Sequence, residues 1–259
     1  FATGVKSKMW EYKYKAEDPN FPEIPKITPG ESQPDSERVS SFVYPGGILA
    51  VHSQGRGKEA IWTALKNKNV YGTSGPKILL WFDLLNSPEG KVPMGSKITM
   101  SQNPRFIVRA AGSFKQNEGC AHESIDSLSA ERLEYLCAGE CYNPTNEREI
   151  IEKIEVVKIT PQNYEGEAIS PLIQDPWKTI QCPMEGKCIA EFEDQNFSRD
   201  SVYYVRAIQK PTLAINGSPL SQRENFELCK GSFRTDLEDN CLSMTGERAW
   251  SSPIYVDKP

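Results

Sequence analysis

The chain has 259 residues, a formal net charge of −5, 38% hydrophobic residues and 25% charged residues. These proportions indicate a folded globular chain, long enough for one large domain or two ordinary ones. The negative charge and the absence of a Lys/Arg cluster argue against a nucleic-acid partner. No apolar run approaches the roughly 18 residues that a membrane-spanning helix needs.

Residues 1–77 predict an extended segment, a strand and a helix, in that order. The extended segment is rich in proline, which prevents a helix there: Pro19, Pro22, Pro25, Pro29 and Pro34. A short apolar run at 47–51 predicts a buried strand. Apolar residues recur at three-to-four spacing between residues 58 and 68, which predicts an amphipathic helix. Glycine and proline at 72–76 are expected to end it.

Residues 78–259 change to short apolar runs separated by Gly, Pro, Asn and Asp. Strands are predicted at 78–84, 97–100, 105–110, 150–159, 178–182, 188–192, 201–208 and 253–256. One helix is predicted at 127–137. The predicted fold class is therefore mainly β with some α: a β-sandwich over 78–259, preceded by 1–77 as a separate part.

The seven cysteines all lie after Gly119, and their spacing does not match close zinc knuckles. Cys182 and Cys188 bracket a turn between two strand-like runs, so their sulfurs are expected to meet across a hairpin. The other local pairs that could form disulfides are Cys137 with Cys141 and Cys229 with Cys241. Disulfides indicate an oxidising compartment, periplasmic or extracellular. The alternative is a set of buried, reduced thiols.

The chain contains two histidines, and each is a candidate chemical residue. His52 follows the strand predicted at 47–51 and is a weak candidate metal ligand; a packed or hydrogen-bonded histidine is the alternative. His122 lies beside Cys120 but lacks a third group to orient a Cys/His pair. The sequence therefore supplies no catalytic residue on which a mechanism could be built.

Several segments together resemble a known protein family. The helix of residues 58–66 and the Gly/Pro segment 71–78 are similar to the closing helix of bacterial proteins in domain-of-unknown-function family 3604. Segments 200–207, 229–241 and 247–256 resemble later parts of the same family. The matching segments run in order from about residue 42 to the C-terminus. That family is related to the polymerase-and-histidinol-phosphatase (PHP) metal-dependent phosphoesterases.

The resemblance implies a distorted barrel with a multinuclear metal site, followed by a β-rich C-terminal domain. Residues 1–77 would then be the C-terminal remnant of the barrel domain, with residues 2–6 following an Asp-x-His metal motif. This chain has no Asp-x-His or His-x-His motif. We therefore expect no metal or other cofactor in the chain itself, and Zn or Mn in a full-length parent.

The expected function is that of a C-terminal fragment of an exported, phosphoesterase-like protein, inactive when alone. Its expected partner is the N-terminal part of the parent domain. Two alternatives remain open: a carbohydrate- or protein-binding β-sandwich module, and a structural domain that braces the barrel. The sequence does not identify a small-molecule or glycan ligand.

Overall fold

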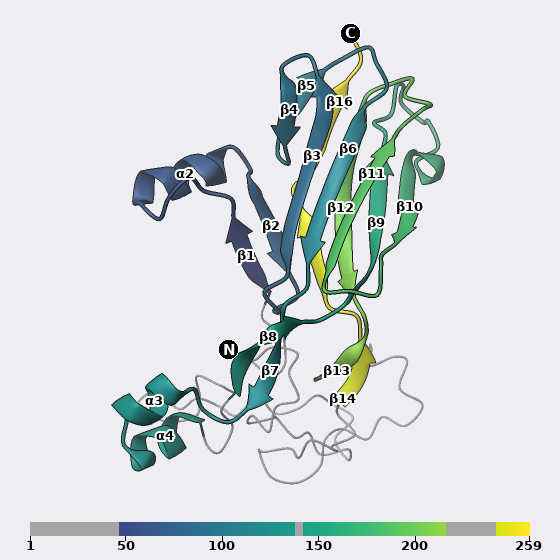
Figure 1. Cartoon of the computed structure of the whole chain (residues 1–259). Coiled ribbons are helices and arrows are strands. Elements are labelled where there is room, and N and C mark those ends of the chain that lie inside the picture. Colours follow the sequence, from purple (N-terminus) through teal and green to yellow (C-terminus); the bar gives the residue numbers. More distant parts are fainter. Residues whose placement is uncertain (1–46, 138–141, 216–241) are drawn as a thin grey trace, which may run out of the picture. The chain divides into compact units, whose positions relative to one another are not determined.

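The computed structural model describes residues 47–137, 142–215 and 242–259, and most of its elements are β-strands (Figure 1). The predicted mainly-β class is therefore confirmed. Within the described residues, no helix has the length and apolar character needed to cross a membrane. Residue contacts divide the chain into two units. The larger one comprises residues 47–114, 146–210 and 246–259.

The larger unit contains an eight-stranded sheet built around the central strand β12 (Ser201–Gln209). One edge of β12 pairs with β15 (Arg248–Ser251) and β16 (Ile254–Asp257), and the other pairs with β9 (Ile151–Ile159). The remaining strands are β1 (Ile48–Val51), β2 (Val70–Thr73), β5 (Lys97–Thr99) and β10 (Ile173–Gln181). All pairs in this sheet are antiparallel except β16 with β5.

The second sheet of this unit has four antiparallel strands in the order β11-β6-β3-β4. Their bounds are Lys187–Glu193 for β11, Arg105–Ala111 for β6, Leu79–Ser87 for β3 and Gly90–Pro93 for β4. Figure 1 shows these strands lying across β12 and β9 as a second layer. The predicted β-sandwich is thus the architecture of this unit.

The core lies between the two sheets, because alternate residues of each strand point inward. On β3 the inward residues Leu80, Phe82 and Leu84 are fully buried. Phe106 of β6 lies 4.7 Å, between ring centroids, from Tyr203 of β12 in the opposite sheet. Burying each such side chain contributes about 1.5–3 kcal/mol, so these apolar layers are the main force that holds the sandwich together.

The smaller unit comprises the described residues 115–137, 142–145, 211–215 and 242–245. It includes two helices, α3 (His122–Ser127) and α4 (Ala130–Cys137). The helix predicted at 127–137 corresponds to α4, which starts three residues later, and α3 was not predicted. Leu128 has an extended backbone (φ −121°, ψ 147°), which ends α3 before α4 begins. The strand pairs are β7 (Phe114–Glu118) with β8 (Tyr142–Arg148), and β13 (Thr212–Ile215) with β14 (Leu242–Thr245).

The segment that resembles a closing helix forms a strand–helix–strand unit. Helix α2 (Lys58–Lys66) lies between β1 and β2, close to its predicted bounds. After the helix, Lys68 takes the left-handed conformation (φ 56°) that reverses the chain. Residues 72 and 73 of the segment that was expected to end the helix belong to strand β2. This strand pairs with both β1 and β15. Residues 1–46 lie outside the described part, so the domain boundary at residue 77 stays a prediction.

Candidate functional site

His52, the weak metal-ligand candidate, lies directly after β1 and hydrogen-bonds the small sheet. Its Nε2 lies 2.8 Å from the carbonyl oxygen of Leu80 on β3. A carbonyl only accepts, so Nε2 must carry the hydrogen and donate it. The backbone N–H of His52 also donates to the Asn69 carbonyl at 2.8 Å. This bond joins the two ends of the segment that contains α2.

His52 contacts β3 on the edge that faces β4, at a position that β4 does not reach. Strand β4 pairs with β3 only at Asp83, Leu84 and Ser87. At Leu80 the backbone is met by two side chains instead, His52 and Tyr71. Buried backbone polar groups need hydrogen-bond partners. The side chains of His52 and Tyr71 provide these bonds, which a neighbouring strand would otherwise make.

Tyr71 of β2 completes this contact and is itself buried. Its hydroxyl donates to the Ile78 carbonyl at 3.1 Å, and its ring lies 5.3 Å from that of His52. Burial raises the pKa of the Tyr71 hydroxyl, against the lowering effect of the hydrogen bond with the Leu80 backbone. The tyrosine therefore stays neutral and acts as a packed hydrogen-bonding group.

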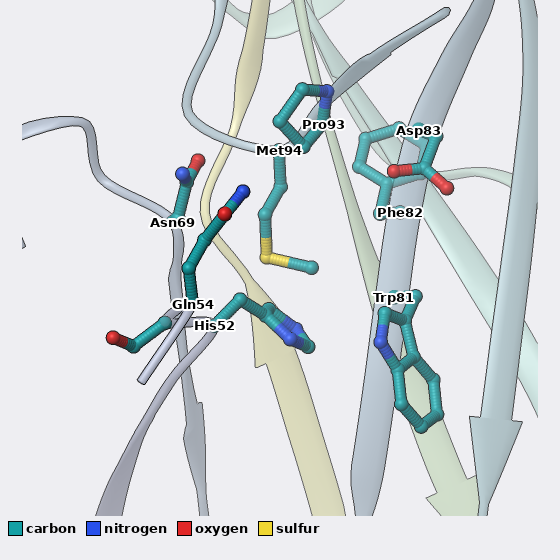
Figure 2. A pocket seen from close by; sticks show the side chains of 9 residues that line it. His52, Gln54, Asn69, Trp81, Phe82, Asp83, Pro93 and Met94 are labelled. Atoms are coloured by element: carbon teal, nitrogen blue, oxygen red, sulfur yellow. The ribbon is translucent and has the colours of Figure 1, made fainter. Parts of the chain in front are cut away.

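A pocket of ≈ 320 Å³ opens beside His52 (Figure 2). It is lined by residues from the β1–α2 and α2–β2 connections, from β3, and from the end of β4 with the residue after it. These are His52, Ser53, Gln54, Asn69, Trp81, Phe82, Asp83, Pro93 and Met94. Figure 2 shows the Gln54 and Asn69 side chains on one side of the pocket and the β3 side chains on the other.

Asp83 is the buried carboxylate of this pocket, with 7% of the residue exposed. Its Oδ2 lies 2.9 Å from Lys91 Nζ and 3.2 Å from Arg109 Nη2. The Arg109 guanidinium also lies over the ring of Trp81, 5.7 Å from its centroid. Two cations therefore already neutralise the one carboxylate that lines the pocket.

A second cluster of ionisable groups lies in the core, away from the lining of this pocket. Asp194 Oδ2 accepts from Lys158 Nζ at 2.5 Å and from the Tyr203 hydroxyl at 2.6 Å. Burial alone would raise the pKa of Asp194, but the hydrogen bonds from Lys158 and Tyr203 hold it below its usual value. Burial and the neighbouring carboxylate raise the pKa of Tyr203. This cluster is an internal ion pair suited to holding the two sheets together.

The cysteines give one complete local pair. Cys182 and Cys188 form the predicted disulfide, with a Cα–Cα distance of 5.5 Å. The expected hairpin is wrong, because β10 pairs in the large sheet and β11 in the small one, so the bond closes a connection between the two sheets. Cys120 is also disulfide-bonded. The other candidate pairs fall outside what can be described: Cys141, Cys229 and Cys241 lie in undescribed segments, and only the backbone of Cys137 is placed.

The predicted and observed sites overlap in one residue, His52. Across residues 47–137, 142–215 and 242–259, no group of three or more His, Cys, Asp or Glu side chains is arranged to hold a metal ion. The sequence reading missed Gln54, Asn69, Trp81 and Asp83. The available signal was Trp81 and Asp83 two apart on a predicted strand, which places both on one face.

The model of a family described as "Protein of unknown function (DUF3604)" matches residues 3–118. This match supports the likeness to that family over a stretch that contains β1 to β6, His52 and the pocket. No curated protein and no solved structure matches the chain.

Proposed function

We propose that this chain is a structural, non-catalytic C-terminal part of an exported bacterial protein that resembles PHP-type metal-dependent phosphoesterases. The family match over residues 3–118 supports the kinship. The observation that carries the structural role is the contact of His52 and Tyr71 with the Leu80 backbone. Through it, the segment that resembles a closing helix is fastened to the sandwich.

This contact defines what the 47–77 segment does in the proposal. Strands β1 and β2 extend the large sheet through β15, while His52 reaches the edge of the small sheet. The segment is therefore bonded to both layers of the sandwich. A helix carried between β1 and β2 is held in a fixed position relative to both sheets, which is the property that a connector to a neighbouring domain needs.

The described residues do not fit the multinuclear metal site that the resemblance implies. Such a site uses several His and Asp/Glu ligands. The chain has two histidines, and Nε2 of one of them donates its hydrogen to the Leu80 carbonyl. We therefore place Zn or Mn chemistry in the parent's barrel and derive no reaction step from this chain.

The proposed location is the periplasm or the exterior. The Cys182–Cys188 disulfide supports it, because such bonds persist in oxidising compartments and are rare in the cytosol. The proposed partner is the N-terminal part of the parent domain, which would contact the segment of residues 47–77.

The test is an aryl-phosphatase assay of the chain with Zn²⁺ or Mn²⁺, combined with urea unfolding of two histidine variants. We expect no turnover. His52→Ala should lower the free energy of unfolding by about 1–3 kcal/mol, because it removes a hydrogen bond and a packed ring. His122→Ala, the matched control in the other unit, should change it little. Metal-dependent turnover that His52→Ala abolishes would overturn the proposal.

A further inference from the structure

The pocket beside His52 contains polar groups that no residue in the described part of the chain satisfies. The side-chain amides of Gln54 and Asn69 and the indole Nε1 of Trp81 form no hydrogen bond there. Asp83 uses Oδ2 for its two cations, and its Oδ1 is likewise without a partner among these residues. Gln54 is exposed, and Asn69 and Trp81 are half-buried, so their polar atoms are open to a ligand that enters from solvent.

These groups offer donors and acceptors in a mixture that suits hydroxyl groups. Each amide of Gln54 and Asn69 both donates and accepts, the indole of Trp81 donates, and the Asp83 oxygen accepts. A hydroxyl group also donates and accepts, so a ligand with several hydroxyls can satisfy all four groups together.

Each formal charge at the pocket already has a partner. Asp83 carries the only formal charge among the lining side chains, and Lys91 and Arg109 already pair with it. An anion would meet the Asp83 carboxylate at close range. A cation would be repelled by Lys91 and Arg109, which already hold this carboxylate. The ligand that fits is neutral.

Apart from His52 and Ser53, the rest of the lining is apolar. Met94 and Phe82 are buried, and Pro93 closes the side at the end of β4. A pocket of ≈ 320 Å³ lies near the lower end of the range of about 300–1,000 Å³ that is usual for small-molecule sites. The ligand must therefore be small, with both hydroxyl groups and C–H faces.

We propose that this pocket binds a neutral sugar residue of monosaccharide size. Gln54 and Asn69 hydrogen-bond its hydroxyls from the β1–α2 and α2–β2 connections. Trp81 Nε1 and Asp83 Oδ1 meet it from β3, while Pro93 contacts its C–H groups. The site is independent of the structural role proposed above and would add glycan recognition to it.

The test uses the whole chain and a panel of neutral monosaccharides: glucose, galactose, mannose and N-acetylglucosamine. Binding is measured by isothermal titration and by the shift of the Trp81 indole N–H signal in a proton–nitrogen NMR spectrum. Trp81→Phe assigns that signal. Gln54→Ala should weaken binding by about 2- to 13-fold, the usual worth of one hydrogen bond. Asn69→Ala should do the same.

The matched control is Trp62→Phe, because Trp62 is an exposed indole on α2 outside the pocket lining. It should leave binding unchanged. The proposal is supported if at least one sugar shifts the Trp81 signal, and if Gln54→Ala or Asn69→Ala weakens the binding of that sugar while Trp62→Phe does not. It is overturned if no sugar of the panel binds at millimolar concentration. It is also overturned if phosphate or acetate binds in the pocket more tightly than every sugar.

Discussion

The buried ion pair between Lys158 and Asp194 gives the sharpest stability prediction. Asp194 is 1% exposed, and it accepts hydrogen bonds from Lys158 at 2.5 Å and from Tyr203 at 2.6 Å. Asp194→Asn keeps the shape but leaves the Lys158 ammonium, with 11% of its side chain exposed, facing a neutral amide. Breaking one side of a buried pair costs about 3–5 kcal/mol, and we expect a loss of that size in the free energy of unfolding.

The assay is urea unfolding at pH 7, followed by circular dichroism. Lys158→Met and the double variant Asp194→Asn/Lys158→Met complete a double-mutant cycle. The double variant should lose less than the sum of the single losses, because it leaves no unpaired buried charge. Losses that simply add, or an Asp194→Asn loss below about 1 kcal/mol, would refute the reasoning.

The same pair predicts part of the acid sensitivity. The folded-state pKa of Asp194 is lowered from an ordinary value of 3.8. A group whose pKa is lower in the folded state stabilises the fold fully above its unfolded pKa, and this contribution is lost as the pH falls through the folded pKa. Asp194→Asn should therefore lose less stability than the wild type when the pH is lowered from 5 to 3.

Three further changes test other contacts. Gly112→Ala should cost at least about 2 kcal/mol, because the new Cβ would lie 1.9 Å from the Glu149 carbonyl oxygen. Replacing both cysteines of the Cys182–Cys188 disulfide with alanine should cost about 2 kcal/mol, the loop-closure value for a sequence separation of 6. Hydrogen bonds from Arg199 lower the pKa of Glu167 from 4.5 to about 2, so Arg199→Ala should return its NMR titration midpoint towards 4.5.

Each of these changes has a control or a contrary outcome. Gly72→Ala is the control for Gly112, since a Cβ there meets nothing within 4 Å, and it should change stability by less than about 1 kcal/mol. Equal losses for the two glycine variants would contradict the steric argument. A double cysteine variant as stable as the wild type would show that the closed loop adds nothing. A Glu167 midpoint near 4.5 in the wild type would exclude the predicted effect of Arg199.

The sequence located most of the strands of the sandwich and the helix α2. Apolar runs such as 201–208 and 105–110 follow from local composition, because a buried strand needs an apolar inner face. It missed short strands such as β2 and β15, because runs of four residues are too short to show a clear alternation. These strands exist because partner strands lie beside them, which is a property of the assembled sheet.

The site shows the same division. The sequence alone determined that the chain is mainly β and has few histidines, and it paired Cys182 with Cys188. Only the tertiary structure showed that the strands beside this disulfide lie in different sheets. Only the tertiary structure decided the role of His52, because its partner Leu80 lies 28 positions away on an edge left open by β4. The pocket arises in the same way: two connections carry Gln54 and Asn69, strand β3 carries Asp83, and no local pattern encodes their meeting.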